Sequence, residues 1–113
     1  MIEQDNLGLT KSLNKGIKIA KSQYIARQDF DDISHPERLA KQYKFLNSNK
    51  EYAVCGTFCK KIDINNKFIG KIKNSSDSAD HNKKIQYYNT LIHPSVMFRK
   101  HEIIDIGLYN ENF

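Results

Sequence analysis

Long apolar runs are absent from this sequence, and cysteine is scarce. No stretch of about 18 apolar residues occurs, so a membrane-spanning helix is excluded. Residues 1–6 hold neither a basic nor an apolar segment, and we therefore expect no secretory signal and a cytoplasmic location. Hydrophobic residues make up only 39% of the 113 residues, but six Tyr and six Phe argue against a disordered chain. We expect one domain at most.

Cysteine chemistry is limited to Cys55 and Cys59, four residues apart. On a strand their Cα atoms would lie about 13 Å apart, at ~3.3 Å per residue, which is too far for a disulfide. A single pair of thiols also argues against a structural metal site. We predict that both are small apolar packing residues.

The charge balance is basic, because 18 Lys and Arg face 13 Asp and Glu, for a net charge of +5. This charge is compatible with nucleic acid, an acidic membrane face or a phosphorylated ligand as partner. A basic stretch interleaved with Phe58 and Phe68 has no recognised nucleic-acid motif, so we interpret it as a sheet edge protected by lysines and expect no nucleic-acid partner. Its lysines are Lys60, Lys61, Lys67, Lys71 and Lys73.

Apolar spacing predicts two helices. The first is expected over residues 11–21, with Thr10 as its N-cap. The second is expected over residues 35–47, where Ser34 and Glu37 have the spacing of a capping box.

Strands are expected where β-branched and aromatic residues gather, over residues 24–28, 52–62, 68–72 and 96–98. Residues 73–84 are polar and predict a loop, and residues 85–92 leave helix and strand open. Residues 93–95 break the pattern at Pro94, and the residues after 98 are expected to be short and irregular. The alternation of helices and strands predicts an α/β fold.

Three carboxylates gather at the end of the first predicted strand, at Asp29, Asp31 and Asp32. In open α/β sheets ligands bind outside the carboxyl ends of the strands. Asp29 and Asp31 would project to one side of an extended segment, with Cα atoms about 7 Å apart. Such carboxylates suit Mg²⁺ or Mn²⁺ together with ligand phosphate, and a cation held there neutralises a diphosphate leaving group. An Asp-rich turn that complements a helix N-terminus remains the alternative interpretation.

Two other acidic motifs fit poorly. A calcium loop needs Asp or Asn at its fifth position and Gly at its sixth, where this chain has Ile33 and Ser34. An aspartyl-nucleophile phosphatase would place its Asp-X-Asp after an apolar strand, whereas Arg27 and Gln28 precede the motif here.

An ordered set of blocks carries a resemblance to a known family. The blocks are residues 6–17, 24–42, 93–100 and 107–113, and the second contains Asp29-Phe30-Asp31-Asp32-Ile33-Ser34-His35-Pro36. In order and spacing they resemble the middle of family 2 glycosyltransferases, over nearly the whole chain. A lone Asp-X-Asp is a weak signal, but the ordered set is specific.

The resemblance implies a glycosyltransferase A-type fold, a Rossmann-like α/β sheet with flanking helices. It also implies a nucleotide-diphosphate-sugar donor, a divalent metal (Mn²⁺ or Mg²⁺) and a glycan or lipid-linked acceptor. The location implied is the cytoplasm, including the inner membrane face.

The same resemblance assigns site residues. The metal set is Asp29, Asp31 and Asp32, with Asp31 as the direct ligand and Asp29 also contacting the donor. The other donor-binding residues implied are Asn6, Gly8 and Asn14. Many relatives carry Ala-Arg-Asn where this chain has Ser12-Leu13-Asn14, so a contact from that Arg is missing here.

Two family segments have no counterpart in the sequence. Relatives begin with a strand and an Asp-Asp-Gly-Ser segment that binds the nucleobase, and they carry a Glu-Asp pair after the block at residues 107–113. We therefore expect residues 1–113 to form a single partial glycosyltransferase domain whose general base lies beyond Phe113, so that no catalytic residue is assigned. The alternatives are a non-catalytic remnant, a half that needs a complementary chain or self-association, and, on charge alone, a nucleic-acid-binding module.

Four further residues have expected roles near the acidic cluster. Arg38 and Gln42 are expected to brace it by hydrogen bonds. His93 is interpreted as a structural loop residue before Pro94, although a metal or acceptor contact stays open. His35 is expected to be exposed at the start of the second helix.

Overall fold

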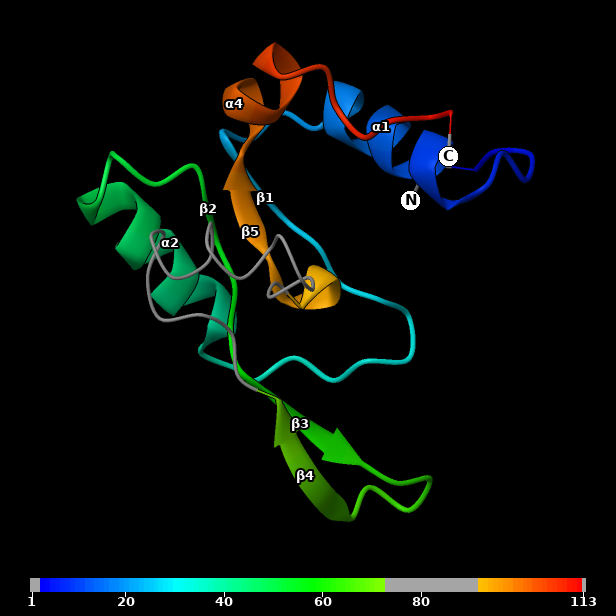
Figure 1. The fold of residues 1–113 in the computed structure, drawn as a ribbon, viewed down its shortest axis with the longest axis vertical. Helices are drawn as coiled ribbons and strands as arrows, with labels where there is room; N and C mark the ends of the chain where they lie inside the picture. The colour runs from blue at the N-terminus through cyan, green and yellow to red at the C-terminus, as the bar shows by residue number, and fades with distance from the viewer. Residues whose placement is uncertain (1–2, 73–91, 113) are drawn as a thin grey trace.

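The computed structural model describes residues 3–72 and 92–112 and shows a mixed α/β fold, which confirms the predicted class (Figure 1). The elements in chain order are α1 (Leu9–Ile19), β1 (Tyr24–Ala26), α2 (Arg38–Ser48), β2 (Val54–Cys55), β3 (Cys59–Ile62), β4 (Phe68–Ile72), the 3₁₀ helix η1 (His93–Ser95), β5 (Met97–Arg99) and α4 (Lys100–Asp105). The predicted loop at 73–84 and nearly all of the ambiguous segment at 85–92 lie outside the described residues. None of the described helices is long and apolar enough to cross a bilayer.

A three-stranded sheet in the order β1-β5-β2 forms the centre of the fold. Both pairings with β5 are antiparallel, with Phe98 opposite Ile25 on one side and Val54 on the other. All three residues of β5 are buried, as expected for a central strand. Because both pairings with β5 are antiparallel, the rule for ligand sites in open parallel sheets does not locate the acidic cluster. The cluster lies where the chain leaves the carboxyl end of β1.

The apolar core is small and centres on α1 and the segment that contains β5. Ile17 of α1, Val96 and Phe98 are buried together. Partly buried neighbours pack against them, namely Ile25, Val54, Ile103, Leu108 and Tyr109. The core therefore fixes α1 and the C-terminal segment on the sheet that leads into the acidic cluster.

The first helix begins and ends two residues earlier than predicted, and the prediction of Thr10 as N-cap was wrong. Gly8 precedes the helix with φ of +84°, a conformation that glycine adopts without a Cβ penalty. The backbone N–H of Ser12 donates to the Gly8 carbonyl at 3.1 Å, which places Thr10 inside the helix.

The second helix begins at Arg38 and not at residue 35, and the predicted capping box is not formed. No side chain caps this helix. Ser34 instead donates to Oε1 of Gln28 at 2.6 Å and accepts a bond from Arg38. Because the Ser34 hydroxyl is bonded to Gln28 and Arg38, it does not cap the helix.

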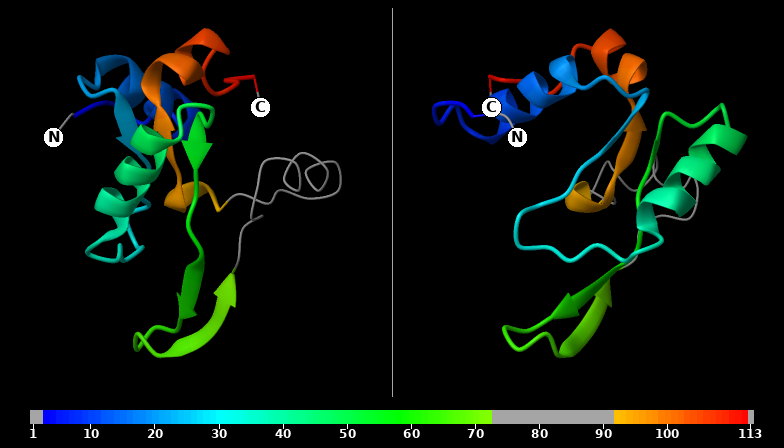
Figure 2. Two further views of the ribbon diagram at one scale, coloured as in Figure 1. Left: turned by 90° about the vertical axis from the view of Figure 1, so that its left-hand side faces the viewer. Right: turned by 180° about the vertical axis from the view of Figure 1, so that it is seen from behind.

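The predicted strand at 52–62 is divided into β2 and β3, and the irregular C-terminal segment proves to contain α4. Among the described strands β3 pairs with β4 alone, in a separate antiparallel hairpin that projects away from the helices and the central sheet (Figures 1 and 2). α4 has only six residues and no side-chain cap, so its sequence lacks the N-cap signal that usually marks the start of a helix.

Candidate functional site

The acidic segment that follows β1 is a loop held by its own side chains. It comprises residues 27–37, and its aspartates are the half-buried Asp29 and the exposed Asp31 and Asp32. Gln28 donates through Nε2 to the Asp32 carbonyl at 2.7 Å and to the Asp29 carbonyl at 3.2 Å. The backbone N–H of Asp32 also donates to the Asp29 carbonyl, at 3.2 Å. These bonds close a turn that presents the carboxylates on one short loop.

Arg38 anchors this acidic loop to the body of the protein, as predicted. Its buried guanidinium donates through Nη2 to the Arg27 carbonyl at 2.6 Å. Nη1 donates to Gln28 Oε1 at 2.8 Å and to Ser34 Oγ at 2.9 Å. Hydrogen bonds from a charged donor contribute about 1.5–3 kcal/mol each when buried. One side chain of α2 therefore holds both ends of the turn that carries the carboxylates.

Gln42, one helical turn after Arg38, extends this anchor to the sheet. Its Oε1 accepts from Nε of Arg38 at 3.0 Å. Its Nε2 donates to the carbonyls of Ser95 at 2.8 Å and Cys55 at 3.2 Å. Within the described residues Gln42 reaches the acidic loop only through Arg38, and it links α2 to η1 and β2, so direct bracing of the loop is confirmed for Arg38 alone.

Arg27 adds a contact that the sequence reasoning did not assign. Its Nη2 lies 3.5 Å from Oδ1 of Asp29, and its Nη1 lies 3.4 Å from Nδ1 of His93. A guanidinium only donates, so this contact requires Nδ1 of His93 to act as acceptor. Nε of Arg27 is buried without a hydrogen-bond partner in the part of the chain that the structure describes. The position of Arg27 between the strand and the Asp-X-Asp motif is the sequence feature that would have predicted a contact with the acidic loop.

The donor set of the acidic loop suits a hard divalent cation. Asp29 and Asp31 supply carboxylate oxygens, and Mg²⁺ or Mn²⁺ is bound by one or two carboxylates together with phosphate and water oxygens. Over residues 3–72 and 92–112, no group of three or more His, Cys, Asp or Glu side chains is arranged to hold a metal ion. The three-carboxylate set of Asp29, Asp31 and Asp32 therefore stays a prediction.

The other predicted donor-binding residues lie at the start of α1 and on its inner side. Asn6 accepts a bond from the backbone N–H of Gly8 at 3.1 Å, and both residues are exposed. Asn14 is 3% exposed, and its Nδ2 donates to the Tyr109 carbonyl at 2.8 Å and to Oε1 of Glu111 at 2.9 Å. Its Oδ1 accepts from the Tyr109 N–H at 2.9 Å, so the amide of Asn14 ties α1 to the C-terminal segment.

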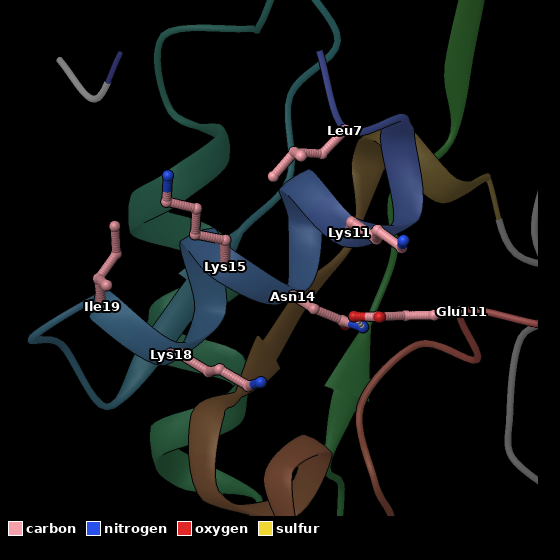
Figure 3. A pocket seen from close by; sticks show the side chains of 7 residues that line it. All are labelled: Leu7, Lys11, Asn14, Lys15, Lys18, Ile19 and Glu111. Carbon is pink, nitrogen blue, oxygen red and sulfur yellow. Dashed lines mark hydrogen bonds between the residues drawn. The ribbon is translucent and has the colours of Figure 1, made fainter. Parts of the chain in front are cut away.

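Two open hollows lie beside α1, and neither is lined by the acidic loop. The first has a volume of about 320 Å³, and Figure 3 shows Asn14 and Glu111 meeting at its wall. Its other lining residues are Leu7, Lys11, Lys15, Lys18 and Ile19. The second has a volume of about 530 Å³ and runs along residues 106–112, sharing Asn14, Lys18 and Glu111 with the first. Asn14 thus lines both hollows, but the structure does not bring it together with Asp29, and its role in binding the donor stays a prediction.

Both cysteines are free thiols, which agrees with the prediction that they form no disulfide. Burial raises the pKa of the Cys55 thiol, and a hydrogen bond with Gln42 partly opposes that shift. The raised pKa keeps Cys55 protonated and unreactive, as expected for a packing residue.

Comparison with known proteins identifies relatives over almost the whole chain. The sequence profile described as glycosyl transferase family 2 matches residues 1–105. The amylovoran biosynthesis glycosyltransferase AmsE of Erwinia amylovora is 33% identical over 109 residues, covering 96% of this chain and 41% of that protein. The O-antigen biosynthesis glycosyltransferase WbnJ of Escherichia coli is 35% identical over 96 residues, covering 85% and 37%. An uncharacterized glycosyltransferase of Methanocaldococcus jannaschii is 35% identical over 95 residues, covering 83% and 33%. The chain spans less than half the length of each of these relatives.

Proposed function

The chain belongs to glycosyl transferase family 2, and on this premise we propose that it serves the transfer of a sugar from a nucleotide-diphosphate donor to an acceptor hydroxyl. Its helices and small sheets agree with a partial glycosyltransferase A-type domain. The observation that carries the proposal is the acidic loop of residues 27–37, which Arg38 anchors within the region that matches the family.

The acidic loop is proposed to form the donor side of the site. Asp31 and Asp29 would hold Mn²⁺ or Mg²⁺, with Asp32 beside them. When bound, such a cation supplies positive charge that stabilises a departing diphosphate. Support comes from the carboxylate oxygens that the loop presents and from the hydrogen bonds that limit its motion. Arg27 is proposed to orient the Asp29 carboxylate through their 3.5 Å contact.

The nucleotide is proposed to lie toward the start of α1, near Asn6, Gly8 and Asn14. The positive φ of Gly8 gives the chain a sharp entry into the helix, and the two adjoining hollows provide open surface near Asn14. Asn14 can keep its hydrogen bonds to Tyr109 when the nucleotide binds, because Lys11, Lys15 and Lys18 of the same helix also line the first hollow.

The acceptor is proposed to be a glycan or a lipid-linked saccharide, handled in the cytoplasm at the inner membrane face. Two relatives are named for amylovoran and O-antigen biosynthesis, which are pathways of polysaccharide assembly. The proposal assigns no general base within the sequence.

A second candidate function is that of a half-domain that works with a complementary chain or a second copy. The support for it is that several large apolar side chains of the described residues are exposed, which a second chain would cover. They include Leu9 of α1, Leu39 of α2 and Ile106 after α4.

Calorimetric titration tests the donor site directly. A panel of nucleotide-diphosphate sugars is titrated into the folded chain with and without Mn²⁺. We expect Mn²⁺-dependent heat with at least one donor, loss of that heat in Asp31→Asn, and its retention in the matched exposed control Asp105→Asn. The proposal would be overturned if the folded chain gave no heat with any of the donors. It would also be overturned if the two variants gave equal heat. Sedimentation of the same samples separates the half-domain, which is expected to associate, from an autonomous monomer.

A further inference from the structure

The β3–β4 hairpin presents apolar side chains to solvent at its far end. We define the hairpin tip as Ile62, Ile64, Phe68 and Ile69. Ile64 is 97% exposed, Ile69 61% and Phe68 59%, and the hairpin projects clear of the central sheet (Figure 2). Exposed large apolar groups gathered on one projection indicate a surface that is covered by a partner.

The turn at this tip is built so that its isoleucine points outward. Oδ1 of Asp63 accepts the backbone N–H groups of Asn65 at 2.8 Å and Lys67 at 2.9 Å, and the Asp63 N–H donates to the Lys67 carbonyl at 2.9 Å. The turn is therefore closed by Asp63 and by the positive φ of Asn66. Ile64 contributes nothing to this closure, and β-branched apolar residues are unfavourable choices for a turn. An apolar environment around the tip would account for its presence there.

The strands of the hairpin carry lysines and no acidic residue of their own. Lys60 and Lys71 are direct cross-strand partners, an arrangement of like charges that destabilises an antiparallel pair. Nζ of Lys71 lies 5.3 Å from the centre of the Phe58 ring, and within the described residues neither lysine has a carboxylate at salt-bridge distance. Residues 59–72 hold four lysines against the single carboxylate of Asp63, which the turn already engages. An anionic partner would remove this repulsion.

We propose that the hairpin docks on an anionic lipid bilayer, with the hairpin tip entering the interface and the lysines contacting lipid phosphates. A bilayer accounts for both observations, because it offers an apolar layer directly beneath a layer of negative charge. This inference gives a surface to the membrane placement proposed above, but its test requires no sugar transfer, so the two stand or fall separately.

Vesicle co-sedimentation of the full chain tests this docking. We expect binding to phosphatidylcholine vesicles that contain phosphatidylglycerol, little binding to phosphatidylcholine alone, and release by salt. The double variant Lys60→Gln/Lys71→Gln should bind roughly 25-fold more weakly, at about fivefold per lysine. The control Lys21→Gln/Lys44→Gln, with exposed lysines outside the hairpin, should lose far less.

The apolar part is tested by Ile64→Ser/Ile69→Ser against the control Leu39→Ser/Ile106→Ser, in which the isoleucine and leucine are likewise exposed. Only the hairpin variant should lose vesicle binding, and circular dichroism should show both variants folded. Absence of binding to anionic vesicles, or equal losses in the variants and their controls, would overturn the proposal. Binding of a single-stranded RNA oligonucleotide in place of vesicles would also overturn it, in favour of a nucleic-acid surface.

Discussion

Nη2 of Arg38 lies 2.6 Å from the carbonyl oxygen of Arg27, the residue with which the chain leaves β1 for the acidic loop. Arg38 is buried, and it also bonds Gln28, Ser34 and Gln42. A single side chain therefore connects the strand end, the turn of carboxylates and the helix behind them. This connection matters for the proposed site, because a cation is bound best by carboxylates that are held in place beforehand.

Replacement of Arg38 by Ala should destabilise the fold and loosen the acidic loop together. Several buried acceptors lose their donor, so we expect the free energy of unfolding in urea to fall by about 3 kcal/mol. The matched surface variant Lys44→Ala should change it by about 0.5 kcal/mol or less. Equal stability of Arg38→Ala and Lys44→Ala would show that the hydrogen bonds of Arg38 do not stabilise the loop.

Asn14→Asp should release the C-terminal segment from α1. The substitution replaces the Nδ2 donor with a carboxylate that faces the Tyr109 carbonyl and the Glu111 carboxylate, so two attractive contacts become repulsive. We expect a loss of about 2–3 kcal/mol in unfolding free energy. Limited proteolysis should then cut between residues 106 and 112.

The control for this variant is Asn110→Asp. The Asn110 side chain is exposed and accepts a bond from the Asn112 N–H, which a carboxylate also accepts. Its proteolysis pattern should match that of the unmodified chain. Protection of residues 106–112 in Asn14→Asp would contradict the role of Asn14 as the link.

The Cys55 thiol should make stability depend on pH on the alkaline side. Burial raises its folded pKa above the ordinary value of 9.0, so the folded state holds the proton more tightly than the unfolded state. The resulting stability is fully present below the unfolded pKa and is lost as the pH rises through the folded pKa. Urea unfolding between about pH 8 and pH 11 should show this decline in Cys59→Ser. The decline should be smaller in Cys55→Ser/Cys59→Ser, and identical profiles would rule out a contribution from Cys55.

The sequence predicts the main elements and the acidic cluster, because both depend on residues that are close together in the chain. The Asp-X-Asp motif and the bracing by Arg38 fall into this group, since Arg38 is one short loop beyond the carboxylates. Helix starts were predicted less well: Thr10 and Ser34 have the residue type of a cap, but Gly8 begins one helix and Arg38 engages Ser34 before the other.

Contacts between segments that are distant in the chain cannot be predicted from this sequence. Arg27 meets His93 across 66 positions, and Asn14 meets Tyr109 across 95. Neither pair has a local periodicity that would reveal it, and each is fixed by how α1, β1 and β5 pack around Phe98. The prediction that Asn14 binds the donor rests on local sequence, which does not reveal that its amide is bonded to Tyr109 and Glu111.

Iron-mediated cleavage of the backbone tests most directly whether the acidic loop holds the cation. Fe²⁺ replaces Mn²⁺ in the presence of the donor that gives heat by calorimetry, and ascorbate with peroxide then cuts the chain beside the bound ion. We expect cleavage within residues 27–33, lost in Asp31→Asn, retained in Asp105→Asn and suppressed by excess Mn²⁺. Cleavage confined to other parts of the chain, or unchanged in Asp31→Asn, would contradict a metal site on this loop.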